Sequence, residues 1–126
     1  MADKKLVSLI KRLKEKTLKG SISWEKTVEE GVFQASFPDY AITIGSERRE
    51  DTWNYVFRIY NDKGELVEVI AETDFSSDDF GVRPYDFIDE IYVVARRTAM
   101  EVDQAIDSIL SALGRADTSI EKEVSY

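Results

Sequence analysis

The side chains with the most usable chemistry are arginines that lie close in the sequence to aromatic residues. Arg83, Tyr85, Tyr92 and Arg96 fall within one short stretch. Arginine presents a planar fork of N–H donors that suits carboxylate or phosphate, and aromatic rings offer stacking faces. Together with Trp24, these residues predict a site for a phosphorylated or nucleotide-like anion. The alternative is that the arginines pair with carboxylates of the acidic body, and that Trp24 seals the junction between the first helix and the sheet.

The densest acidic segment is Asp-Phe-Ser-Ser-Asp-Asp at residues 74–79. Three carboxylates in six residues could bind a hard cation through oxygen. The spacing does not match an EF-hand loop, and carboxylates and serines before a helix usually form caps and turns. We therefore predict neither a metal nor a cofactor, and a carboxylate-based, metal-dependent enzyme is kept as an alternative.

The chain lacks the residue types on which most catalytic sites depend. It has no cysteine and no histidine, which excludes disulfides, thiolate metal sites, cysteine nucleophiles and serine–histidine pairs. Its six glycines stand one at each junction between expected elements, and they form neither a phosphate-cradling loop nor a nucleophile elbow. This composition predicts a protein that is not an enzyme.

Charge is distributed unevenly along the 126 residues. The total is 17 basic and 25 acidic residues, or −8. Residues 1–20 carry seven basic and two acidic residues, or +5, which leaves −13 for residues 21–126. An acidic body disfavours direct contact with nucleic acid, although it could imitate phosphate charge on a basic partner. No secretory signal or membrane span is visible, so we expect a cytoplasmic protein with no membrane contact.

Residues 3–19 have the periodicity of an amphipathic helix. Leu6, Ile10 and Leu13 fall on one face. Asp3 is expected to cap its start, and Gly20 stands at the position just past its end.

Four strands are expected next, at residues 32–37, 40–44, 53–60 and 65–71. The third has the clearest alternation of apolar and polar positions. Because the links between strands are short, an antiparallel meander is the expected topology. The second face of this sheet is partly apolar, and it predicts either cover by a loop or tail or an oligomer interface.

Residues 84–113 carry a long helical pattern that starts at Pro84 and stops before Gly114. Such a helix would be roughly 45 Å long, about twice the length of a strand in the sheet. We expect it either to bend near residues 98–102 or to pack its second half on the first helix or on another subunit. Oligomer contact is favoured, so a homo-oligomer is predicted. A single domain at residues 1–114 and a loose tail at residues 115–126 complete the expected organisation.

Several short segments resemble a diffuse group of small bacterial and phage-borne proteins without an assigned activity. The segments are Leu-Ile-Lys-Arg-Leu at residues 9–13 with Gly20, Ile22-x-Trp24, Tyr-Asn-Asp-Lys-Gly-Glu-Leu at residues 60–66, Ala95-Arg96-Arg97-x-Ala99, Val102-Asp103 and Ala105-Ile106. The resemblance implies a small helix–sheet–helix protein that is often associated with mobile elements. It implies no catalytic residue.

The sequence thus predicts an α+β fold with a helix, a four-stranded antiparallel meander and a long, possibly bent, C-terminal helix, with the helices on one sheet face. The expected function is that of a non-enzymatic interaction or sequestering protein. A phage-encoded anti-defence protein that binds a nucleotide-like signal or a host protein would fit this description. The alternatives are an acidic nucleic-acid mimic, a metal-dependent enzyme, and a regulatory partner of a neighbouring gene product.

Overall fold

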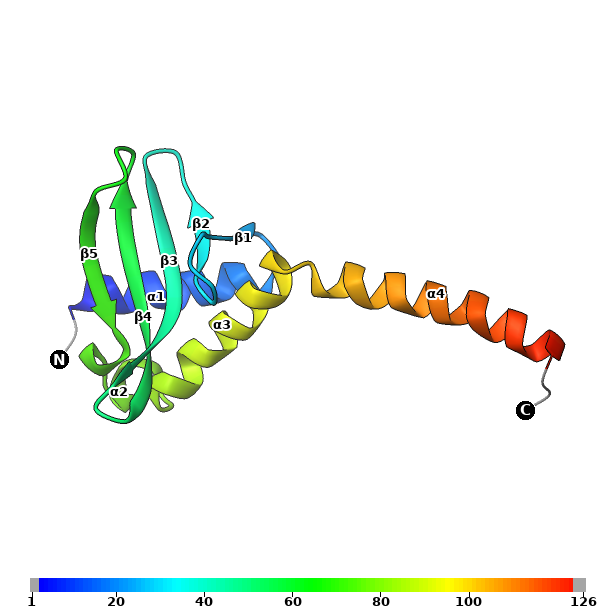
Figure 1. The fold of residues 1–126 in the computed structure, drawn as a ribbon. Coiled ribbons are helices and arrows are strands. Elements are labelled where there is room, and N and C mark those ends of the chain that lie inside the picture. Colours follow the sequence, from blue (N-terminus) through cyan, green and yellow to red (C-terminus); the bar gives the residue numbers. More distant parts are fainter. Residues whose placement is uncertain (1–2, 124–126) are drawn as a thin grey trace.

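The computed structural model describes residues 3–123, with side chains from residue 3 to residue 115. An N-terminal helix is followed by a five-stranded antiparallel sheet and then by helices (Figure 1). The predicted α+β class is confirmed. The elements are, in chain order, α1 (Lys4–Leu18), β1 (Trp24–Lys26), β2 (Phe33–Ser36), β3 (Tyr40–Arg49), β4 (Thr52–Asn61), β5 (Leu66–Ala71), the 3-10 turn η1 (Glu72–Asp74), α2 (Ser77–Phe80), α3 (Pro84–Ala99) and α4 (Val102–Glu123).

Helix α1 begins and ends within one residue of its predicted bounds. The Oδ1 of Asp3 accepts a hydrogen bond of 2.7 Å from the backbone N–H of Lys5, which is the geometry of an N-cap. Gly20 takes a left-handed φ of 75° just after the helix, a conformation that glycine adopts without steric cost. The predicted cap and stop are therefore both confirmed.

The sheet has five strands rather than the four predicted, and its spatial order follows the chain. The missed strand is β1, which has three residues and pairs with β2 so that Trp24 lies opposite Ala35. A strand this short gives no alternation that could be read from the sequence. The antiparallel meander itself is confirmed.

Strands β3 and β4 form the longest hairpin, and β3 runs to Arg49 rather than to the predicted end at residue 44. The turn consists of Glu50 and Asp51, with φ of 48° and 67°. Two-residue hairpin turns with both φ values positive are usually built from Asn-Gly or Asp-Gly. Because this turn contains neither asparagine nor glycine, the sequence gives no turn signal, and the predicted strand stops too early.

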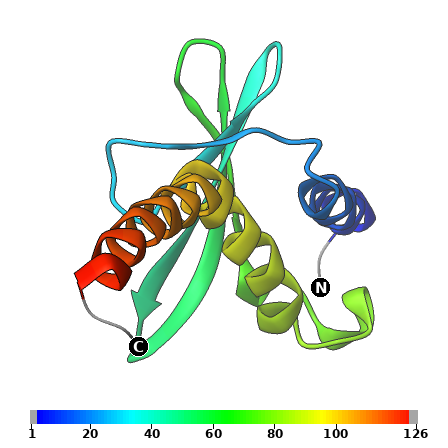
Figure 2. The ribbon, with the colours of Figure 1, turned by 90° about the vertical axis from the view of Figure 1, so that its right-hand side faces the viewer.

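One face of the sheet forms the core together with α1 and α3 (Figures 1 and 2). The buried residues of this cluster are Ile10, Leu13, Trp24, Phe33, Ala35, Ile42, Ile44, Tyr55, Phe57, Ile70, Phe75, Ile88, Ile91 and Ala95. The alternation predicted for β4 is confirmed at Tyr55 and Phe57, whereas Trp53 at the start of the strand is exposed. Both predicted helices were expected to pack on this face. The predicted helix at residues 84–113 does so only as far as Ala99, at the end of α3.

The opposite face of the sheet is partly covered by the loop that joins β1 to β2. Val32 of this loop lies directly over Gly45, where an added Cβ would meet Val32 Cγ2 at 3.0 Å. Val56 is buried on this face, while Val67 and Val69 of β5 are exposed. Cover by a loop, one of the two predicted possibilities, therefore holds for part of this face.

The predicted helix at residues 84–113 is two helices that change direction at Met100 and Glu101 (Figure 1). The N–H groups of these two residues close α3 through hydrogen bonds to Arg96 O (2.8 Å) and Thr98 O (3.2 Å). Glu101 then takes a left-handed φ of 53°, which ends the helical path. The bend falls inside the predicted interval 98–102.

Beyond the bend, α4 points away from the sheet and from α1 (Figures 1 and 2). The predicted alternative in which this half of the helix packs on the first helix is therefore wrong. Helix α4 also continues to Glu123, across most of the segment 115–126 for which the sequence predicts a loose tail. Residues 124–126 lie outside the described residues.

Candidate interaction surface

The apolar face of α4 is exposed along the part of the helix whose side chains the structure describes. Every residue from Asp103 to Arg115 is exposed. The exposed fractions are 44% for Ile106, 59% for Ile109, 60% for Leu110 and 52% for Leu113. Contiguous exposed apolar groups on a soluble protein mark a contact surface. We call Val102, Ile106, Ile109, Leu110 and Leu113 the α4 seam.

The spacing within the α4 seam is that of a helix–helix contact. Val102, Ile106, Ile109 and Leu113 follow one another at intervals of four, three and four residues. A repeat that averages 3.5 residues keeps one narrow apolar stripe facing a partner helix. Gln104 and Ser111 lie on the opposite side of the helix, since they are about 180° from the centre of this stripe.

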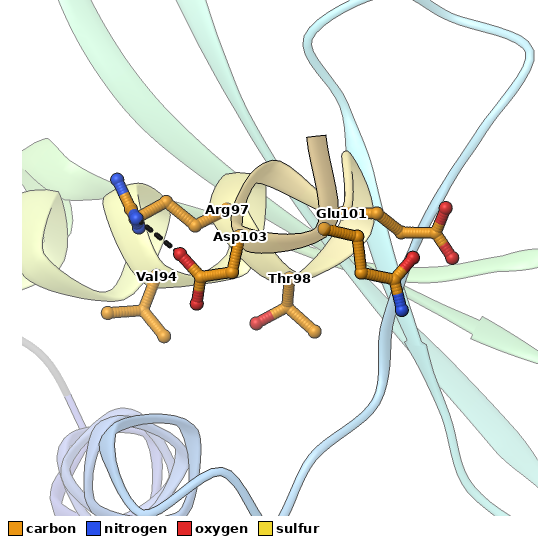
Figure 3. Close-up of a pocket in the computed structure, with 6 residues that line it drawn as sticks. Val94, Arg97, Thr98, Glu101 and Asp103 are labelled. Carbon is orange, nitrogen blue, oxygen red and sulfur yellow. Dashed lines mark hydrogen bonds and ion pairs between the residues drawn. The ribbon is translucent and has the colours of Figure 1, made fainter. Parts of the chain in front are cut away.

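The junction between α3 and α4 is held by an ion pair across the bend. Arg97 of α3 donates a hydrogen bond of 2.6 Å from Nη2 to Oδ1 of Asp103 in the first turn of α4 (Figure 3). Figure 3 also shows Val94 and Thr98 projecting to the same side, and these residues line a shallow hollow of about 440 Å³. The pair links the last turn of α3 to the first turn of α4. Since both partners are half-exposed or more, it contributes little to global stability.

Three of the five predicted ligand-binding residues share one face of α3. Tyr85, Tyr92 and Arg96 are separated by seven and four residues, which places them along a single stripe of the helix. The two tyrosines both pack against Tyr55 of β4, with ring centroids 5.2 Å and 5.1 Å away. Asp89, which lies between them on the same stripe, accepts a hydrogen bond from the Tyr55 hydroxyl.

This tyrosine cluster is tied into the fold by its hydroxyl groups. The Tyr92 hydroxyl donates a hydrogen bond of 2.8 Å to the carbonyl oxygen of Gly31. Burial raises the pKa of Tyr92 above its usual value, and the charge of Arg96 opposes part of that rise. Burial also raises the pKa of Tyr55, and the bond to the Asp89 carboxylate raises it further. Tyr55 and Tyr92 therefore keep their phenols protonated and hydrogen-bonded to the protein itself.

The other two predicted ligand-binding residues lie elsewhere. Trp24 is buried in the core, and its Nε1 donates a hydrogen bond of 3.1 Å to Oγ1 of Thr17. It therefore occupies the junction between the first helix and the sheet, which is its predicted alternative role. Arg83 is exposed before α3 and pairs with Asp86 through bonds of 2.8 Å and 3.1 Å. The structure thus places Tyr85, Tyr92 and Arg96 along one stripe of α3, with Trp24 apart from them in the core. Arg83 lies close enough to Tyr85 for a charge interaction, but its guanidinium is bonded to Asp86. Ligand binding by these residues stays a prediction.

Sequence reasoning missed Tyr55 and Asp89 as members of the cluster. A signal was present for both. Asp89 lies four residues after Tyr85 and three before Tyr92, on the same helical stripe. Tyr55 lies on the core-facing side of β4, and it is the tyrosine on that side of the strand. What the sequence could not supply is that α3 crosses β4 at this point.

The acidic segment at residues 74–79 caps the turns that follow the sheet. Oδ2 of Asp74 accepts a hydrogen bond of 2.9 Å from the N–H of Ala71, and Oδ2 of Asp79 accepts one of 2.8 Å from the N–H of Ser76. These carboxylates serve as caps, as the alternative to cation binding predicts. Within residues 3–123 no group of three or more potential metal ligands is found.

No family model, no curated protein and no solved structure matches this chain. In the part of the chain that the structure describes, no helix combines the length and the apolar composition needed to cross a membrane.

Proposed function

We propose that the protein is a non-enzymatic interaction protein, in which a compact α+β body carries α4 as a docking helix for another protein chain. The observation that carries this proposal is the exposed α4 seam. A helix with one apolar stripe in water is held mainly by packing of that stripe rather than by helix propensity. The seam therefore has the character of one half of an interface.

The hydroxyl and carboxylate side chains that could take part in chemistry support a binding role rather than catalysis. The hydroxyls of Tyr55 and Tyr92 and the carboxylates of Asp74 and Asp79 all form hydrogen bonds that hold elements of the fold together. The sequence has no histidine or cysteine to supply a base or a nucleophile. On this proposal the body carries α4, and the apolar seam of α4 binds the partner chain.

The finer predictions from the sequence belong with this proposal. The partners that the sequence predicts for such a helix are a second copy of the chain in a homo-oligomer, or a host protein or the product of a neighbouring gene that the complex would sequester in the cytoplasm. Binding of a nucleotide-like anion by Arg83, Arg96 and the α3 tyrosines is a separate prediction that the docking role does not require. The same is true of an origin in a phage anti-defence system.

A matched pair of variants tests the docking role. Ile109→Asp places a charge in the middle of the α4 seam, and Ser111→Asp places the same charge on the opposite side of the same turn. Complexes are measured in two ways, by sedimentation of the purified protein and by cross-linked co-purification from the producing cell. The proposal expects Ile109→Asp to abolish whichever complex forms and Ser111→Asp to preserve it. A wild-type protein that forms no seam-dependent complex in either measurement contradicts it.

A further inference from the structure

We infer that the α4 seam is occupied by the α4 helix of a second copy of this chain, packed antiparallel. This inference rests on the proposed docking role of α4 and names the partner. It makes the protein a two-fold dimer in which the two bodies lie at opposite ends of a short helical pair.

The spacing of the seam selects a helix as its occupant. Val102, Ile106, Ile109 and Leu113 form a stripe with intervals of four, three and four residues. Such a stripe lets each side chain fit between residues of a facing helix over successive turns. Leu110 widens the stripe on one side, and it would cover the edge of the contact.

The flanks of the seam favour close approach of an apolar helix. Ala105 and Ala112 border the stripe on the side away from Leu110, and small side chains there let two helix backbones come near each other. No charged residue interrupts the stripe between Val102 and Leu113, because Asp103 and Asp107 lie on its outer edge. An identical seam therefore meets no charge within the stripe.

A second copy also leaves no part of the seam uncovered. When two identical stripes pack about a two-fold axis, each covers the other and the assembly closes. Helix α4 has 22 residues, or roughly 33 Å. It stands clear of the body along this length (Figures 1 and 2), so a second helix can lie beside it without meeting the sheet.

Charge decides the orientation of the pair. Residues 1–101 contain 15 of the 17 basic residues and 20 of the 25 acidic ones, so the part of the chain before α4 carries −5. A parallel pair would bring two such bodies to the same end and would repel them. An antiparallel pair places the bodies at opposite ends of the paired seams, and it also sets the two helix dipoles in opposite directions.

The first test is the mass of the purified full-length protein, measured by sedimentation over a wide concentration range. The expected result is a monomer–dimer equilibrium with a dissociation constant on the order of micromolar, as suits a short helical contact. Ile109→Asp is expected to weaken the dimer by at least about 100-fold, because each dimer loses two buried isoleucines. Ser111→Asp is expected to leave the dissociation constant within about twofold. Near-ultraviolet circular dichroism of Trp24 and the tyrosines checks that the body of each variant is folded.

The second test measures the orientation with single spin labels on the side of α4 away from the seam. Gln104, Ser111 and Arg115 lie on that side and the chain has no native cysteine, so one cysteine at each position can be labelled cleanly. A parallel pair gives the same label-to-label distance at all three positions. An antiparallel pair gives axial offsets that differ by at least about 12 Å between two of them.

The outcomes separate this inference from the proposed function. A wild-type monomer at all concentrations, a dimer that Ile109→Asp leaves intact, or an oligomer larger than a dimer overturns the second-copy inference. Equal distances at the three labels overturn the antiparallel arrangement. A monomer that still forms a seam-dependent complex with a different chain overturns the inference and leaves the docking role standing.

Discussion

The indole of Trp24 and the hydroxyl of Thr17 form the direct polar link between α1 and β1. Trp24 Nε1 donates to Thr17 Oγ1 at 3.1 Å, and the two residues are 2% and 1% exposed. Strand β1 has only three residues, so its own ladder with β2 holds it weakly. The link therefore anchors the edge of the sheet to the first helix.

Removing the acceptor of this bond is expected to destabilise the whole fold. Thr17→Val keeps the volume of the side chain but leaves the buried Trp24 N–H without a partner, at a cost of about 1–3 kcal/mol. Denaturant unfolding followed by tryptophan fluorescence measures the change. Thr17→Ser is the control, because it loses a methyl group but keeps the hydroxyl. If Thr17→Val is as stable as the wild type, the hydrogen bond does not anchor β1.

The bond from Tyr92 to Gly31 makes a second prediction about stability. It joins α3 to the loop between β1 and β2, at a donor–acceptor distance of 2.8 Å. Tyr92→Phe removes the donor and is expected to cost about 0.5–1.5 kcal/mol. Tyr40→Phe, at an exposed residue, is the matched control and is expected to change the free energy of unfolding by less than about 0.5 kcal/mol. Equal effects in both variants would contradict this role for the Tyr92 hydroxyl.

The raised pKa of Tyr55 predicts a loss of stability at alkaline pH. Its phenol ionises at higher pH in the folded protein than in the unfolded chain, where the pKa is about 10. Above that pH the unfolded chain binds fewer protons than the folded one, so the free energy of unfolding falls as pH rises. The slope for one such phenol is up to about 1.4 kcal/mol per pH unit. Below about pH 10 the group causes no change with pH.

Unfolding curves measured between about pH 9 and pH 11 test this dependence, since they bracket the ordinary tyrosine pKa. Tyr55→Phe lacks the ionising group and is expected to show a shallower fall than the wild type. Tyr40→Phe keeps Tyr55 and is expected to reproduce the wild-type slope. A Tyr55→Phe protein with the full wild-type slope would show that other groups cause the alkaline loss.

The parts of the fold that could be predicted from the sequence are those with local signals. Helix α1 has a cap, a periodic face and a glycine stop, and β4 has alternating residues over most of its length. The parts that could not be predicted depend on tertiary contacts or on unusual residues. Strand β1 is set by pairing with β2, and the turn at Glu50 and Asp51 uses residues that rarely take positive φ.

The same division applies to the candidate sites. The apolar intervals of α4 are visible in the sequence, and so is the overhang of a helix longer than the sheet. Tyr55 could not be placed beside Tyr85 and Tyr92 from the sequence, because that contact depends on where α3 crosses β4. A tryptophan can serve in a core or in a ligand site, so the sequence does not decide between these roles for Trp24. Its burial in the structure does.

Glu101 leads to the last prediction, because it holds the bend between α3 and α4 in a left-handed conformation with a φ of 53°. A side chain costs about 1 kcal/mol in this region, and glycine avoids most of that cost. The carbonyl oxygen of Glu101 accepts the hydrogen bond from Ala105 N–H that opens α4, at 3.0 Å, so the exchange rate of the Ala105 amide measures how firmly the bend is held.

Glu101→Gly is expected to slow that exchange by up to about fivefold, which corresponds to about 1 kcal/mol. Glu101→Val is expected to accelerate it, because a β-branched residue fits a positive φ poorly. The Ile91 amide, in the buried part of α3, is the internal control, and its exchange should change far less. If the Ala105 amide of the valine variant exchanges as slowly as that of the wild type, the left-handed conformation of Glu101 does not set the bend. The Arg97–Asp103 ion pair would then be the next contact across the bend to test.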